Sequence, residues 1–257
     1  MGGLYRGVKL IAVEPVHIAL NDSGSCGVYI TPRNISETSA DIGILVKLDK
    51  AETAEAKAVI YDPQGKPVTE FFGRADKDRI TLSGKINCPK LWDGVNSPAL
   101  YRAEITLFCN GKPVDSIEQE FGIRSYRIDA NNGFFLNGKP YPLHGVNYHQ
   151  DSYESGWAMT DAQRERDYRI IRDMGCTAVR MAHYQHCDHE YSLCDRLGLC
   201  VWTEIGIINK MSADEAMLMF FQTALEITQN SSFVSLSGRI TITRQLLSGD
   251  CPTNFTR

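Results

Sequence analysis

The sequence predicts a chain of two parts, an antiparallel β-sandwich of immunoglobulin-like size followed by a parallel α/β domain. The first observation is a series of short β-patterned runs, separated by turn sequences, that continues to about residue 125 with no helical stretch. The second is a change of period after residue 140, where strand-like and helix-like segments alternate. With 257 residues, 43% of them hydrophobic, the chain can bury a sizeable core.

The expected sandwich strands are short runs of β-forming residues that end at turn sequences such as DPQGKP and CNGKP. They are KLIAVEPVHIAL (9–20), GVYITPRNI (27–35), DIGILVKLD (41–49), AKAVIYD (56–62), RITLSGKI (79–86), RAEITLFC (102–109) and DSIEQEFGI (115–123). A further hairpin is expected in FFLNGKPYPLHGV, with Asn137 and Gly138 at its turn.

The α/β part is expected to contain three strands and three helices in alternation. The strands are PLHGVNYH (142–149), TAVRMAHY (177–184) and LCVWTEI (199–205), and the helices are TDAQRERDYRIIRDMG (160–175), DHEYSLCDRLG (188–198) and SADEAMLMFFQTALEITQ (212–229). Thr160 or Asp161 caps the first helix, and Gly198 closes the second. Ser212 is the expected N-cap of the third.

Three polar residues fall where the predicted parallel strands end. They are His149, His183 and Glu204. Chemistry in parallel α/β sheets gathers at the carboxyl ends of the strands, so these three residues mark the expected site.

Three of the six histidines and three of the eight cysteines crowd into residues 177–202 and suggest a metal site. Zinc sites usually show two ligand pairs separated by a longer arm, and only one such cluster is present. His183 belongs to a strand end, whereas Cys187 belongs to the following loop. We therefore expect no metal, and expect His186 and His189 to be solvated residues at a helix start.

Composition excludes several classes of function. The net charge is −4 and Lys and Arg are scattered among Asp and Glu, so we expect no nucleic-acid partner. No apolar run approaches the roughly 20 residues that span a bilayer, and no membrane association is expected. The eight cysteines show no disulfide spacing and the first residues lack a signal-peptide pattern, so free thiols and a cytoplasmic location are the expectation.

Several linked segments resemble glycoside hydrolase family 2, the family of β-galactosidases and β-glucuronidases. They are AVRMAHYQ, YSLCDRLGLCVW, FFLNGKPYPLHGVNYHQD, LWDGVNSPALYRAEI and FGIRSYRI. The residues that match the family's barrel signature in type and spacing are Arg180, His183, Tyr184, Asp195 and Gly198. Thr177, Met181 and Gln185 depart from it, standing for an Asn, a small residue and a Pro. The segment HQDSYESGWA resembles the β-galactosidase-like branch.

The resemblance implies a multidomain β and α/β chain, an immunoglobulin-like sandwich followed by the first part of a (β/α)8 TIM barrel. Residues 1–9 would be the end of a missing jelly-roll sugar-binding domain, 10–125 the sandwich, and 126–230 the N-terminal part of the barrel. Residues 231–257 would be a tail outside the family pattern, as a shifted reading frame produces. The alternative is a fourth strand in SSFVSLSGRITITR.

The family's activity is retaining hydrolysis of β-glycosides, in which one carboxylic acid protonates the leaving oxygen and a second carboxylate attacks the anomeric carbon. By resemblance, His149, Asp151, Arg180, His183 and Glu204 would line the galactoside subsite. No cofactor is implied, the partner is a β-galactoside-like carbohydrate, and a homo-oligomer stays open.

Each of these residues also has a structural alternative. Arg180 is as readily a buried ion-pair partner of Glu204 as a substrate ligand. Trp157 and Trp202 could be sugar platforms, although Trp202 is expected in the core.

The catalytic Glu pair of the family has no counterpart in this sequence, which contains no Glu after Glu226. Asp151 and Glu204 are the remaining carboxylates that could face one pocket, and we do not expect them to act as a hydrolytic pair. Two functions remain open. One is a retaining β-glycosidase present as an incomplete chain that is inactive alone, and the other is a non-catalytic carbohydrate-binding or structural remnant.

Overall fold

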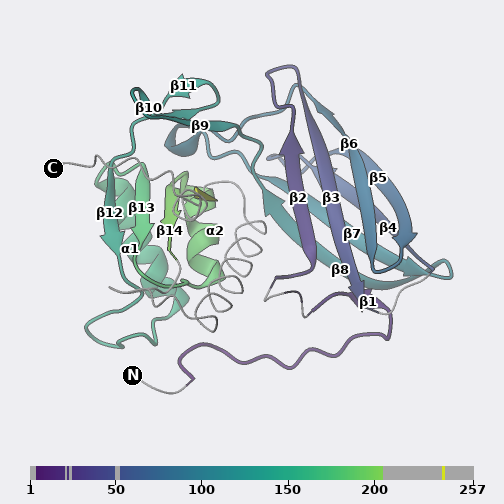
Figure 1. Ribbon diagram of the computed structural model, residues 1–257. Helices are drawn as coiled ribbons and strands as arrows, with labels where there is room; N and C mark the ends of the chain where they lie inside the picture. The colour runs from purple at the N-terminus through teal and green to yellow at the C-terminus, as the bar shows by residue number, and fades with distance from the viewer. Residues whose placement is uncertain (1–3, 21, 23–24, 50–52, 205–238, 241–257) are drawn as a thin grey trace, which may run out of the picture.

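The computed structural model describes residues 4–20, 22, 25–49, 53–204 and 239–240. Figure 1 shows a β-sandwich on one side, a small group of parallel strands with two helices on the other, and a short three-stranded sheet above that group. This arrangement confirms the predicted fold class.

The sandwich is antiparallel throughout. Its strands are β1 (His17–Ile18), β2 (Val28–Arg33), β3 (Ser39–Asp49), β4 (Ala54–Tyr61), β5 (Pro67–Asp76), β6 (Arg79–Asn87), β7 (Tyr101–Cys109) and β8 (Lys112–Phe121). They pair in the order β1-β3-β6-β5-β4-β7-β8, and β2 pairs with β3. The strand β5 pairs with β4 over most of its length and with β6 at its end, so it joins the two layers.

Alternation along the strands builds the sandwich core. Ile42, Ile44 and Val46 of β3 are buried, and the residues between them are more exposed. Their side chains belong to the same buried cluster as Ala58 of β4 and Ile105 of β7. Apolar burial of this kind stabilises by about 25 cal/mol per Å² of area removed from water.

Two features of the sandwich differ from the prediction. The expected strand over 9–20 is reduced to β1, because the residues before it run along the surface, where Leu10 and Ile11 are exposed. The strand β5 was not predicted, because Phe71 is its one buried residue and its apolar alternation is weak. Gly84 of β6 leaves the space that this ring fills, since a Cβ there would lie 2.0 Å from Phe71 Cε1.

A three-stranded sheet follows the sandwich. It contains β9 (Tyr126–Asp129), β10 (Gly133–Leu136) and β11 (Lys139–Pro140). The turn between β10 and β11 has Asn137 at φ 49° and Gly138 at φ 80°, the left-handed conformations that a tight hairpin requires. The predicted hairpin is therefore confirmed.

The barrel part alternates strand and helix as predicted. Its elements are β12 (Gly145–Tyr148), α1 (Asp161–Asp173), β13 (Ala178–Met181), α2 (Asp188–Leu197), β14 (Cys200–Thr203) and β15 (Arg239–Ile240), and all four strands are parallel. Thr160 caps α1 in a reciprocal capping box with Gln163, and Gly198 ends α2 at φ 77°.

Part of the predicted barrel lies outside the described residues. The expected helix 212–229 is in that part, as is most of the tail 231–257. The two described tail residues form β15, which pairs with β14. Among the described helices, none is long and apolar enough to cross a membrane.

The loop of residues 88–100 connects β6 to β7 of the sandwich and contacts the barrel part. The indole Nε1 of Trp92, which is fully buried, donates to the Asp195 carbonyl at 2.9 Å. The loop also contains the short 3-10 helix η1 (Gly94–Asn96), and the Val95 carbonyl accepts a hydrogen bond from Arg172 at 3.0 Å. The two parts are thus held by one buried and one partly buried hydrogen bond, and each of these groups has a partner.

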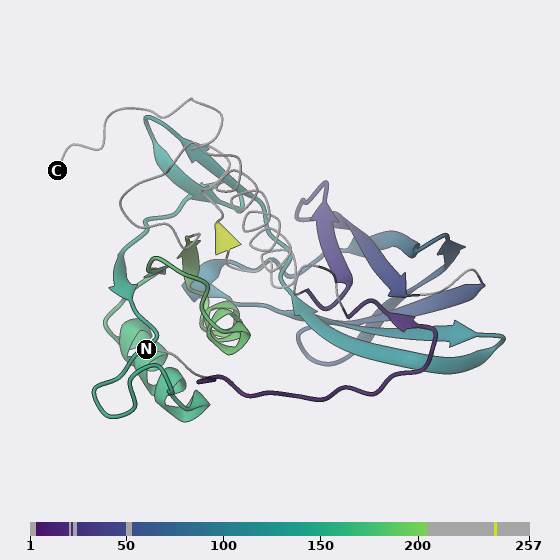
Figure 2. The same ribbon diagram turned by 60° about the horizontal axis from the view of Figure 1, so that its bottom comes forward.

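The segment before β1 also joins the two parts. It begins beside the helices of the barrel part and runs along the bottom of the view to the sandwich (Figure 2). Arg6 Nη2 donates to Gln150 Oε1 at 2.7 Å and to the Gln185 carbonyl at 3.0 Å.

Candidate active site

The candidate site lies where β12, β13 and β14 end. In register, Asn147 lies beside Arg180 and Arg180 beside Trp202, so these three side chains share one face of the sheet. The alternate residues, Val179 and Val201 among them, pack in the cluster that includes the helix residues. The polar face therefore points away from α1 and α2, as the interior of a barrel does.

Glu204 is the centre of the polar contacts at this edge. Arg180 Nε donates to Glu204 Oε1 at 2.8 Å and Arg180 Nη2 donates to Oε2 at 2.9 Å, a bidentate ion pair. The His183 N–H donates to Oε2 at 2.8 Å. Burial raises the pKa of Glu204, but these hydrogen bonds and the Arg180 charge outweigh it and hold the pKa below that of a free glutamate. Glu204 is therefore ionised at neutral pH.

His183 has a left-handed backbone, at φ 69°. A non-glycine residue in this region is strained, and such strain persists where surrounding contacts fix it. Here the fixing contact is the hydrogen bond from the His183 N–H to Glu204. The imidazole Nδ1 lies 3.2 Å from Glu204 Oε2, so both the backbone and the ring of His183 are oriented by one carboxylate.

The structure brings together four of the five predicted site residues. The His149 and His183 rings lie 5.5 Å apart between centroids, and His183 contacts the Arg180–Glu204 pair. Asp151 is exposed, and in the described part of the structure it takes no part in the hydrogen bonds among Arg180, His183 and Glu204. The predicted ion pair of Arg180 with Glu204 is present, although both side chains stay partly exposed.

The two tryptophans differ from each other in their surroundings. Trp157 is half-buried, and its ring centroid lies 5.1 Å from that of Tyr184 and 5.4 Å from that of Tyr5. Trp202 is 43% exposed, so the expectation that it lies in the core is wrong. Its position on β14 places it on the face of Arg180, away from the helices.

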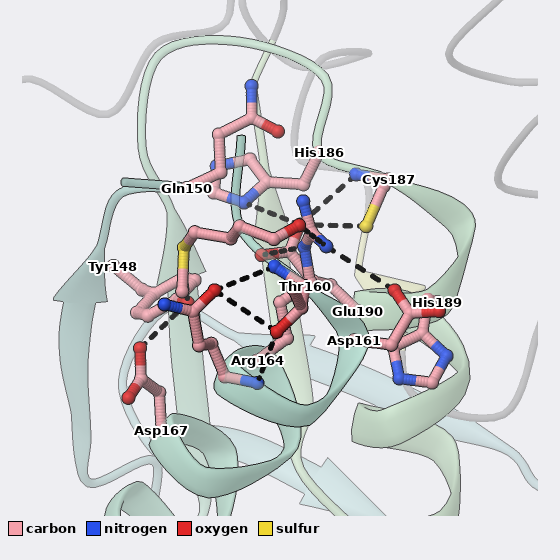
Figure 3. A network of polar contacts seen from close by, with 12 residues as sticks. Tyr148, Gln150, Thr160, Asp161, Arg164, Asp167, His186, Cys187, His189 and Glu190 are labelled. Carbon is pink, nitrogen blue, oxygen red and sulfur yellow. Dashed lines mark hydrogen bonds and ion pairs between the residues drawn. The ribbon is translucent and has the colours of Figure 1, made fainter. Parts of the chain in front are cut away.

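The expectation that His186 is solvated is also wrong. Its side chain is 0% exposed, and its Nδ1 lies 3.3 Å from the equally buried Glu190 Oε2 (Figure 3). Glu190 Oε2 also accepts the Cys187 N–H at 3.1 Å, and Arg164 Nε lies 3.8 Å from Oε1. His189 is half-buried rather than solvated.

Two patterns in the sequence indicate this buried network, and the prediction of solvated histidines does not include them. Glu190 stands three residues after Cys187, the spacing of a capping box at a helix start. Arg164 shares the helical spacing of the buried residues Tyr168 and Ile171, which places its side chain on the inner face of α1. Within the described residues, no three His, Cys, Asp or Glu side chains are grouped so that they could hold a metal ion.

Two family models match the chain. Residues 16–124 match "Glycosyl hydrolases family 2", and residues 128–233 match "Glycosyl hydrolases family 2, TIM barrel domain". The order of these two matches, a sandwich domain followed by a TIM-barrel domain, is the order of the two parts in the structure. The chain belongs to glycoside hydrolase family 2.

Individual relatives agree with the family assignment. A β-glucuronidase of Bacteroides fragilis is 35% identical over 216 residues, which are 80% of this chain and 31% of the relative. A β-galactosidase of Bacteroides ovatus is 30% identical over 211 residues, 79% of this chain and 24% of the relative. The crystal structure of a Bacteroides uniformis β-glucuronidase has a TM-score of 0.81 at 29% identity and covers 89% of this chain and 28% of its own. The chain thus spans a third or less of the length of these relatives.

Proposed function

We propose that this chain supplies the sugar-binding edge of a retaining β-glycosidase that acts on a terminal β-galactoside-like residue. The observation that carries the proposal is the cluster of Arg180, His183 and Glu204 at the strand ends, with the His149 ring beside it. Carboxylate oxygens accept hydrogen bonds, and imidazole nitrogens donate or accept them. The cluster therefore offers both hydrogen-bond donors and acceptors to sugar hydroxyl groups.

The charges of the cluster favour a neutral sugar over a uronic acid. Arg180 is the cation of the cluster, and its guanidinium is engaged by both oxygens of Glu204. A sugar carboxylate at this point would have to compete with Glu204 for Arg180. Hydroxyl groups face no such competition, which supports the galactoside over the glucuronide, although relatives of both names are similar to the chain.

The proposal assigns binding to this chain and assigns no catalytic residue. Retaining hydrolysis needs a carboxylic acid with a raised pKa and a nucleophilic carboxylate about 5 Å away. The lowered pKa of Glu204 does not suit the acid. Both Glu204 oxygens accept hydrogen bonds from Arg180 or the His183 N–H, so neither is free to attack an anomeric carbon. Asp151 is exposed and outside the cluster. We infer that the chain alone does not hydrolyse glycosides.

The test is binding and turnover measured on the same preparation. Isothermal titration of the chain with methyl β-D-galactopyranoside should show binding that is lost in Glu204→Gln. The matched control is Glu70→Gln, which removes one carboxylate of a sandwich ion pair, with Lys57, and should bind as the wild type does. Equal binding by both variants would refute the site.

Turnover is followed with nitrophenyl β-galactoside and β-glucuronide. No release above the uncatalysed rate is expected from the chain. Release that survives Asp151→Asn and is abolished by Glu204→Gln would show that Glu204 is catalytic after all. Absence of sugar binding in the wild-type chain would favour the alternative of a structural remnant.

A further inference from the structure

Tyr184 connects the buried network of Figure 3 to the candidate site. Its ring is stacked on His186, with centroids 5.1 Å apart and planes 15° apart. The Tyr184 ring also contacts the Trp157 ring, with centroids 5.1 Å apart and planes tilted by 38°. Aromatic contacts of this kind fix ring orientation as well as burying area. The Tyr184 ring is thus held by two other rings.

The support beneath Tyr184 is itself fixed. His186 is fully buried and lies 3.3 Å from Glu190 Oε2, and Glu190 is tied to the start of α2 through the Cys187 N–H (Figure 3). Arg164 on α1 donates to the Met159 carbonyl at 2.6 Å and approaches Glu190. Both helices of the barrel part therefore position the ring on which Tyr184 rests.

The Tyr184 hydroxyl has two partners with different requirements. The backbone N–H of Gln150 lies 3.3 Å from the oxygen, and an N–H can only donate, so the oxygen accepts there. His149 Nδ1 lies 3.1 Å from the same oxygen. The hydroxyl proton is then available for Nδ1. Burial raises the pKa of Tyr184 despite the opposing contact from Gln150, which keeps the hydroxyl protonated at neutral pH.

We propose that Tyr184 is a positioning residue that holds neutral His149 in the Nε2–H tautomer, with Nδ1 as acceptor and the Nε2–H as a donor for a sugar hydroxyl. The ring pair Trp157 and His186 fixes the Tyr184 hydroxyl, and the hydroxyl fixes His149. The sugar part of this inference rests on the proposed function, whereas the tautomer does not.

The tautomer is measured by long-range proton–nitrogen correlation on chain labelled with ¹⁵N-histidine, at about pH 8.5, with His149→Gln to assign the signals. The wild-type ring should carry its proton on Nε2. Tyr184→Phe keeps the stacked ring and removes the hydroxyl, so the ratio of the Nε2–H to the Nδ1–H form should fall about fivefold, the effect of one neutral hydrogen bond.

The control is Tyr61→Phe, which removes a hydroxyl that donates to Glu104 at 3.1 Å in the sandwich and should leave the His149 signals unchanged. A wild-type His149 with its proton on Nδ1 overturns the proposal, and this result needs no variant to fold. An unchanged ratio in a folded Tyr184→Phe chain overturns it as well.

Sugar binding separates this inference from the proposed function. The Kd for methyl β-D-galactopyranoside should rise about fivefold in Tyr184→Phe if the Nε2–H contacts the sugar. If Tyr184→Phe shifts the tautomer and the wild-type chain binds no sugar, the role of Tyr184 is supported and the sugar site is refuted. Sugar binding with no tautomer shift supports the sugar site and refutes the role of Tyr184.

Discussion

The left-handed backbone of His183 allows a sharp test of strain at the site. At φ 69° a side chain costs about 1–2 kcal/mol relative to glycine. Glycine loses more freedom on folding, which costs about 0.5–1 kcal/mol relative to alanine. Both His183→Gly and His183→Ala remove the same ring contacts to Arg180 and Glu204. The glycine variant should therefore be the more stable of the two by about 0.5–1 kcal/mol.

Urea unfolding followed by tryptophan fluorescence measures this difference. The three tryptophans, Trp92, Trp157 and Trp202, lie in the barrel part or against it, so the signal reports on the region of the substitution. With a slope of about 2 kcal/mol per M, the midpoint of His183→Gly should lie about 0.4 M above that of His183→Ala.

A matched pair at His144 controls for the general effect of glycine. His144 is exposed and is not among the residues with positive φ, so His144→Gly should be less stable than His144→Ala by about 0.5–1 kcal/mol. The opposite signs at the two positions are the expected result. A His183→Gly chain no more stable than His183→Ala would refute the argument that the site stores backbone strain.

Three further predictions concern pH, the joint between the two parts, and the tail. Because the pKa of Glu204 is lowered in the folded chain, its contribution to the free energy of unfolding should be complete above about pH 4.3, the unfolded value, and fall below it; Glu204→Gln should remove that part of the pH dependence in urea titrations. Trp92→Ala should lower the free energy of unfolding, measured by circular dichroism, by about 3–5 kcal/mol, whereas Trp202→Ala, at an exposed position, should lower it by less than about 1 kcal/mol. Equal losses would contradict the buried contact of Trp92 between the two parts. Deleting residues 231–257 should leave the thermal unfolding temperature of the rest of the chain unchanged. A clear drop in that temperature would favour the alternative of a fourth strand, of which the structure describes two residues as β15.

The fold was predictable where local sequence and tertiary pairing agree. Thr160 and Gly198 marked helix ends through capping and left-handed φ, and both effects act within a few residues. The strand β5 was missed because its single buried Phe71 depends on the space above Gly84 of another strand. The surface run before β1 was predicted as a strand because Ile11 and Val13 have β-forming side chains, yet exposed β-formers need a partner strand to pair with.

The site was predictable to the level of strand ends and not beyond. Parallel strands bring their carboxyl ends together whatever their loops do, so the grouping of His149, His183 and Glu204 followed from order alone. The buried His186 lies beside Glu190 of α2, and Arg164, which is 22 residues before His186 and on α1, lies 3.8 Å from the same carboxylate. Patterns within one helix do not contain such a pairing.

The contacts of Arg6 show how residues before the sandwich reach the candidate site. Its guanidinium binds Gln150, which follows His149, and the carbonyl of Gln185, which follows Tyr184. One side chain thus ties the loop after β12 to the loop after β13. The separation of these two loops sets the distance between His149 Nδ1 and the Tyr184 hydroxyl. Beside it, Tyr5 packs edge-on against Trp157, one of the rings that hold Tyr184. The segment shown in Figure 2 therefore acts on both partners of that hydrogen bond at once. The geometry of His149 depends on chain that precedes the sandwich as well as on the barrel strands.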